Sequence, residues 1–240
     1  MTLAASLVLL PLLSACATRP TDPDDLAAYN EAHDPAEPTN RAIYRVNLQL
    51  DKYVLKPAAL GYRAITNTPV RDAIHNFLLN LDSPVLFAND VLEGKPTRAA
   101  ATFTRFVLNS TVGIGGFLDI GTDLGVRRHY ADFGETLAVW GVPQGPFVEL
   151  PLYGPSDPRD AIGKGVDIAM DPFTWIGKGD YVTAAKISRF ALEAVDRRER
   201  AIDALDAINK TSLDPYATIR SLYRQNEAAD IATIESGDKP

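Results

Sequence analysis

The chain has 240 residues, a formal net charge of −7 and a single cysteine. This length suits one domain with appendages. An acidic balance without a basic stripe excludes a nucleic-acid binder and disfavours attachment to anionic lipid by charge alone, and one cysteine excludes an intramolecular disulfide framework.

The amino terminus resembles the signal of a bacterial lipoprotein. Leu3 to Leu13 is an apolar run with the length of a signal-peptide core, and it is too short to span a bilayer. It leads into Leu13-Ser14-Ala15-Cys16, which resembles a lipobox, although no Lys or Arg precedes Leu3. The sequence therefore predicts a signal peptide over residues 1–15 and a covalent acyl and diacylglycerol lipid on Cys16, with no other cofactor. The alternative is a chance cysteine after an ordinary signal peptide.

Three regions follow the signal peptide. Residues 16–36 are rich in Pro, Asp, Thr and Ala and predict a flexible tether after the lipidated residue. Residues 37–226 predict one helical domain, and residues 227–240 predict a disordered tail. Because Ala17 stands where inner-membrane lipoproteins commonly carry Asp, the lipobox resemblance implies an anchor in the outer membrane, facing the periplasm.

Helical periodicity and proline caps dominate the domain. Apolar residues from Val70 to Leu81 recur at i, i+3, i+4 and i+7, which predicts an amphipathic helix. Pairs such as Ser83-Pro84 and Asp157-Pro158 predict helix starts. Only residues 147–150 alternate like a strand, so the predicted fold class is all-α. The expected helices cover residues 40–55 (ended or kinked by Pro57), 69–81, 84 to near 94, 97–109, 181–209 and a last helix from 215.

Two uncharged segments interrupt these helices. One runs from Phe106 to Leu118, and the other lies between Thr136 and Val148. Their glycines and prolines disrupt a continuous helix. At membrane depth their backbone amides would need surrounding protein or a water-lined cavity. Taken alone, the second segment favours a buried irregular loop of a soluble core.

Charged and histidine residues form no recognisable catalytic or metal-binding motif. Gly113 to Leu118 begins like a dinucleotide fingerprint but lacks the third glycine. Residues 157–160 favour a charged helix start over a catalytic carboxylate group. Asp196 to Arg200 favours a solvated helix face, and His129, which follows Arg127 and Arg128, is predicted at the surface. The sequence therefore predicts a protein that is not an enzyme.

Five blocks of the sequence, taken in chain order, form one set of motifs. They are DPAEPTNRAIYRVN (34–47), YVLKP (53–57), NLDSPVLFANDVLEGKP (80–96), FTRFVLNSTVGIGGFLDI (103–120) and FGETLAVWGVPQGPFVELPLYGPSDPRD (133–160). Together these blocks resemble the VacJ/MlaA outer-membrane lipoproteins. The resemblance implies an all-helical, single-domain ring of amphipathic helices around a lipid channel, lying in one leaflet of the membrane. It implies non-enzymatic removal of mislocalised phospholipid from the outer leaflet of the outer membrane, which maintains lipid asymmetry. The implied partners are phospholipid, the membrane, an outer-membrane porin trimer and a periplasmic phospholipid carrier protein.

The same resemblance assigns the wall and gate of the channel to the two uncharged segments, with the first facing the second. Two departures concern Pro38-Thr39, where the family usually has Gly-Phe, and Pro143-Gln144, which replaces a glycine–aromatic pair. A scaffold lipoprotein that docks porins without moving lipid is the alternative function, and a lipid-modifying enzyme is a third. The expected channel and gate residues are Val112, Gly113, Gly115, Gly116, Phe117, Phe133, Trp140, Gly141, Val142, Pro143, Gly145, Pro146, Phe147 and Leu150.

Overall fold

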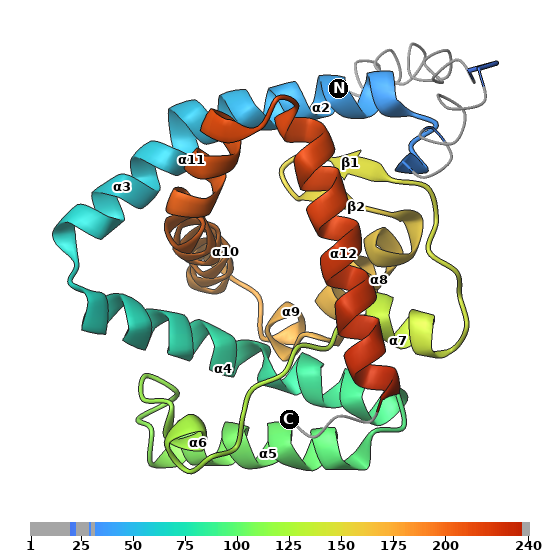
Figure 1. The fold of residues 1–240 in the computed structure, drawn as a ribbon. Helices are drawn as coiled ribbons and strands as arrows, with labels where there is room; N and C mark the ends of the chain where they lie inside the picture. Colours follow the sequence, from blue (N-terminus) through green and yellow to red (C-terminus); the bar gives the residue numbers. More distant parts are fainter. Residues whose placement is uncertain (1–19, 23–28, 30–31, 237–240) are drawn as a thin grey trace.

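The computed structural model describes residues 20–22, 29 and 32–236, and these are predominantly helical. The predicted all-α class is confirmed. In Figure 1, α2, α3, α4 and α12 lie along the sides of an open frame, and α10 is seen nearly end-on within it. The helices are α2 (Glu37–Leu50), α3 (Lys56–Ile65), α4 (Thr68–Leu92), α5 (Pro96–Thr111), α6 (Ile120–Asp123), α7 (Phe133–Val139), α8 (Pro158–Met170), α9 (Pro172–Trp175), α10 (Asp180–Arg200), α11 (Ile202–Thr211) and α12 (Pro215–Glu235), and the antiparallel strands are β1 (Val148–Leu150) and β2 (Gly154–Ser156).

The first side of the frame is α2 followed by α3, joined through a π-helical turn at Asp51–Leu55. Pro57 lies in the first turn of α3, directly after this π-helical turn. The helix predicted over residues 40–55 is therefore present. Its backbone changes hydrogen-bonding pattern near Pro57 and continues.

Helix α4 is one continuous helix of 25 residues with Pro84 inside it. The prediction that a new helix begins at Ser83-Pro84 is wrong. A proline in a helix interior costs about 3 kcal/mol, and packing of α4 along α5 offsets that cost here. Ser83 does not act as a cap: its hydroxyl donates to the carbonyl oxygen of Leu79 at 3.2 Å.

The long helix predicted over residues 181–209 is divided at Ala201 into α10 and α11. Three of the five charged residues just before the break are buried, with Asp196 at 1 %, Arg198 at 6 % and Glu199 at 5 % exposed. Arg197 and Arg200 are exposed, so the prediction of a solvated face is wrong for the other three. Asp196 lies 2.7 Å from His75 Nδ1 of α4, and Arg198 pairs with Asp51, so partners distant in sequence compensate both charges.

Helix α12 continues to Glu235, so the tail predicted from residue 227 begins too early. Ile234 is 1 % exposed, and α12 packs against α7. This tertiary contact orders a stretch whose own apolar pattern is weak. The signal peptide and Cys16 lie outside the described residues, as does most of the predicted tether.

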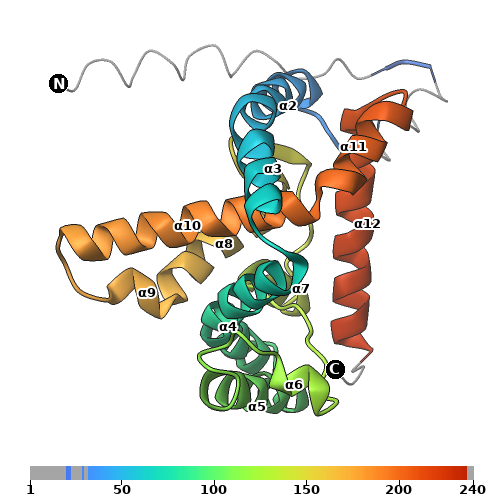
Figure 2. The same cartoon turned by 90° about the vertical axis from the view of Figure 1, so that its left-hand side faces the viewer.

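The apolar core is small and aromatic, formed by Tyr44, Phe147 and Tyr216. Many of the other buried side chains are charged or amide-bearing. Figure 2 shows α8, α9 and the first half of α10 extending to one side of the frame. Among the described helices, none combines the length and the apolarity that crossing a membrane requires.

Candidate lipid-contact site

The first uncharged segment forms an apolar ledge beside α4. Val112 and Ile114 are 61 % and 68 % exposed, and Phe117 stacks on Phe77 with ring centroids 4.8 Å apart. Gly116 has φ +101°, and a Cβ there would lie 2.5 Å from the Cβ of Asn80. Glycine is therefore required at this position, because it lets the backbone lie directly on α4.

The second uncharged segment begins with an exposed aromatic corner. Trp140 is half-exposed, contacts Phe133 at 5.7 Å between ring centroids, and donates its Nε1–H to the carbonyl oxygen of Leu92 at 3.0 Å. Gly141 has φ +88°. Val142 and Pro143 follow it at the surface, so this part of the segment presents carbon to the surroundings.

The same segment then turns inward. Gly145 lies against Pro158, where a Cβ would approach Pro158 Cδ to 2.6 Å. Pro146 and Leu150 are partly buried, and Phe147 is 1 % exposed. Phe147 packs against Tyr216, so its contacts in this structure are those of a core residue.

The two segments are anchored at different points along α4. Phe117 of the first contacts Phe77, while Trp140 of the second contacts Leu92. Phe77 and Leu92 are 15 positions apart in α4, or roughly 22 Å at the rise of an α-helix. The first segment therefore lies against the middle of α4 and the second against its carboxyl end, and the expectation that the two segments face each other stays a prediction.

Two asparagines of α2 hold the second segment against the frame. Asn40 donates to the carbonyl oxygen of Phe147 at 3.0 Å and accepts from the N–H of Glu149 at 3.1 Å. Asn47 makes the same kind of pair with the next part of the strand, at 2.9 Å each. Neither residue was among the predicted site residues. Their spacing of seven on a helix, where asparagine is disfavoured, is the signal that could have found them.

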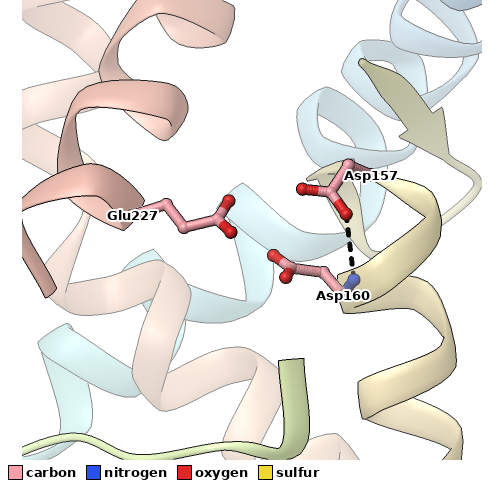
Figure 3. A group of neighbouring side chains, drawn as sticks. All are labelled: Asp157, Asp160 and Glu227. Carbon is pink, nitrogen blue, oxygen red and sulfur yellow. Dashed lines mark hydrogen bonds between the residues drawn. The ribbon is translucent and has the colours of Figure 1, made fainter. Parts of the chain in front are cut away.

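Three carboxylates, from the start of α8 and from α12, point toward one another (Figure 3). Oxygens of Asp157, Asp160 and Glu227 lie within 4.8 Å of one another. The Oδ1 of Asp157 accepts from the N–H of Asp160 at 3.0 Å, so the predicted helix start is confirmed. Arg159 forms an ion pair with Glu227, and Tyr223 donates to both aspartates.

This carboxylate cluster also contacts the second segment directly. Gln144 donates its Nε2–H to Glu227 Oε2 at 2.7 Å. The buried guanidinium of Arg159 already supplies positive charge, so the arrangement fits a structural ion pair better than a metal site. The cluster fixes the segment to α8 and α12.

Another group of buried acids lies where α4 ends and α7 begins. Glu93 and Glu135 are buried. Burial is the main cause that raises the pKa of Glu93 to about 7 and that of Glu135 to about 8. Asp132 adds repulsion to both, and Arg98 opposes the shift at Glu93.

His129 belongs to this interior and not to the surface. Its side chain is 8 % exposed, and its Nε2 lies 2.7 Å from Asp90 Oδ1 of α4. Arg98 of α5 donates to the carbonyl oxygen of Tyr130 at 2.6 Å. The surface prediction is wrong because the extended chain before α7 crosses α4 and α5 and is bound to both.

We expect Glu135→Gln to remove much of the pH dependence of stability. The folded protein holds a proton on Glu135 up to about pH 8, whereas the unfolded chain releases it near pH 4.5, so wild-type stability falls as pH rises through this window. With these two pKa values the variant should gain roughly 4 kcal/mol over wild type at pH 8 and little at pH 4. Urea unfolding at both pH values measures this, with exposed Asp123→Asn as the control. Equal stability of wild type and Glu135→Gln at pH 8 would contradict the buried proton.

A second apolar surface covers the extended arm of α8, α9 and α10. Trp175 is 74 % exposed and Tyr181 is 93 % exposed. Ile168, Ile187 and Phe190 add further exposed carbon. Apolar surface of this kind marks contact with lipid or with another protein.

Comparison with known proteins identifies the family. The family model described as MlaA lipoprotein matches residues 32–230. The chain is 35 % identical over 225 residues to the intermembrane phospholipid transport system lipoprotein MlaA of Haemophilus influenzae, covering 91 % of this chain and 88 % of the relative. The protein of the same name in Escherichia coli K12 is 33 % identical over 218 residues, covering 89 % of this chain and 82 % of the relative.

A solved structure agrees with the sequence relatives. It is described as "Structural basis for maintenance of bacterial outer membrane lipid asymmetry". It superposes with a TM-score of 0.71 at 31 % identity and covers 82 % of this chain and 98 % of that chain. With these matches and the all-helical frame described above, the chain belongs to the MlaA lipoprotein family.

Proposed function

We propose that the protein moves phospholipid without chemical change, taking mislocalised phospholipid from the outer leaflet of the outer membrane and passing it to a periplasmic carrier protein. The observation that carries this is the pair of uncharged segments that expose apolar side chains while protein contacts anchor their backbones. The naming of relatives as phospholipid transport lipoproteins supports the same role. Lipid asymmetry would be maintained as a result.

In this proposal each part of the site has a distinct task. The ledge with Val112 and Phe117, and the corner with Trp140 and Val142, line the path of the acyl chains. Gly113, Gly115, Gly116, Gly141, Pro143, Gly145 and Pro146 shape the backbone of that path. Phe133 supports Trp140 by ring contact, while Phe147 and Leu150 hold the segment to the core. A lipid on Cys16 anchors the protein at the periplasmic face of the outer membrane, and a porin trimer is the proposed neighbour.

Two substitutions near the amino terminus test the anchor and the location separately. In a deletion strain, Cys16→Ala should abolish complementation because acyl chains contribute most of the membrane affinity. Ala17→Asp should keep the lipid but move the protein to the inner membrane, and complementation should fall at least tenfold. The measurement is phospholipid content of the outer leaflet, with membrane fractionation of each variant.

The controls decide between transport and scaffolding. Wild-type complementation should restore the low outer-leaflet phospholipid of the parent strain. If deletion leaves outer-leaflet phospholipid unchanged but disrupts a complex with porins, the protein is a scaffold and the transport proposal fails. Full complementation by Ala17→Asp would overturn the outer-membrane location.

A further inference from the structure

A pocket lies between the first half of α2 and the start of α12, away from the ledge and the aromatic corner. Its volume is about 490 Å³, within the range of small-molecule sites. In Figure 1, α2 and the connection from α11 to α12 lie side by side at the top of the frame. The lining residues are Pro38, Arg41, Tyr44, Arg45, Leu48, Asp214, Pro215 and Tyr216.

The walls of this pocket are apolar and fixed in place. The rings of Tyr44 and Tyr216 meet edge to face at 5.5 Å between centroids, and Phe147 packs against Tyr216 from the core. Tyr216 is 2 % exposed, and its hydroxyl is bonded to Asp34. The carbon walls are therefore preformed, which lowers the entropic cost of binding.

Two arginines line this pocket, and only one of them is bound by carboxylates. Arg41 is bound by Glu37 at 2.6 Å and by both oxygens of Asp214 at 3.1 and 2.5 Å. Arg45 donates its Nε–H to the carbonyl oxygen of Arg41 at 3.2 Å. Among the described residues its terminal nitrogens have no acceptor, and it is exposed. The guanidinium of Arg45 is thus free to bind an anion.

An acid, Asp214, lines the same pocket as this free arginine. The side chain of Asp214 is 41 % exposed although it pairs with Arg41, so its oxygens can accept further hydrogen bonds. A purely anionic ligand would meet repulsion from Asp214 as well as attraction from Arg45. A ligand with a phosphate and an ammonium group satisfies both charges, since guanidinium suits phosphate and carboxylate suits ammonium.

We propose that this pocket binds the head group of a zwitterionic phospholipid, with its phosphate on Arg45, its ammonium on Asp214 and its glycerol and first acyl carbons against the tyrosine, proline and leucine walls. The site is a holding position outside the two uncharged segments. It rests on the proposed transport function for its lipid and adds a head-group preference to it.

The test uses the full-length lipidated protein in non-ionic detergent. It is mixed with phosphatidylethanolamine and phosphatidylglycerol of equal chain length, and bound lipid is counted by native mass spectrometry. Wild type should retain the ethanolamine lipid in preference. Arg45→Ala should bind it about tenfold more weakly, while Arg127→Ala, an exposed arginine outside the pocket, should match wild type.

A second variant changes the preference itself. Asp214→Asn keeps a capping side chain at the start of α12, and it should shift retention toward the glycerol lipid, a result that a merely structural role would not produce. Equal ethanolamine-lipid binding by wild type and Arg45→Ala, or a wild-type preference for the glycerol lipid, would overturn the proposal. So would full competition by glycerophosphoethanolamine at equimolar concentration, which would show that the walls bind no acyl carbon. If the wild type binds as expected but fails to restore lipid asymmetry in cells, the transport function fails and the pocket stands.

Discussion

Replacing Arg159 by methionine is expected to lower the free energy of unfolding by about 3–5 kcal/mol, because it removes one partner of a buried ion pair. Arg159 and Glu227 are 4 % and 7 % exposed. Without the guanidinium, three carboxylates remain together in a largely buried space. Their mutual repulsion and the loss of their buried partner would then weaken the contact between α8 and α12.

Urea unfolding followed by far-ultraviolet circular dichroism measures this loss. Arg127→Met removes an exposed arginine and should change stability by less than about 0.5 kcal/mol. The double variant Arg159→Met/Glu227→Gln should recover part of the loss, since one of the unpaired charges is gone. If Arg159→Met is as stable as the Arg127→Met control, the cluster does not fasten α12.

Replacing Phe147 by alanine should destabilise the protein by a similar amount, about 3–5 kcal/mol, for an unrelated reason. Phe147 is the largest fully buried side chain, and its ring contacts Tyr216 and Tyr223 at 5.9 and 6.0 Å between centroids. Truncation leaves a cavity in a core with few other apolar residues to fill it. The same ring holds the uncharged segment to α12, so the segment should loosen as well.

The matched control is Phe190→Ala, because Phe190 is 54 % exposed on the arm. It should cost less than about 1 kcal/mol. Hydrogen exchange of the amides between residues 139 and 152 gives the second readout, with faster exchange expected only in Phe147→Ala. Equal stability of the two alanine variants would show that Phe147 does not support the core.

Local signals in the sequence predicted much of the helical fold. Asp157 and Asp214 cap α8 and α12 as their position before proline indicates, since that signal depends on neighbours in the chain. The predicted break at Pro84 fails because α5 compensates for the proline. Asp196 was predicted to be solvated because its partner His75 is 121 positions away along the chain, where no local pattern reveals it.

The residues of the candidate site were likewise predictable only where the signal is local. The glycines and the absence of charge were enough to predict the ledge and the aromatic corner, because the composition of a short stretch can be read directly from the sequence. Which of those residues turn inward depends on distant elements: Phe147 is buried by α12, and Gly145 is pressed against Pro158. The hydrogen bonds of Asn40 and Asn47 to the second segment also join residues more than 100 positions apart in the chain, which no local pattern encodes.

The bond between Tyr216 and Asp34 spans 182 positions of the chain, and this sets the order in which the molecule can assemble. Synthesis delivers α2 well before α12, so the aromatic core cannot close until α12 has been made. Until then Tyr44 and Phe147 lack the ring that covers them, and the unfinished chain exposes apolar surface. Such long-range closure slows folding, and the apolar surface that stays exposed until α12 arrives makes the unfinished chain prone to aggregation.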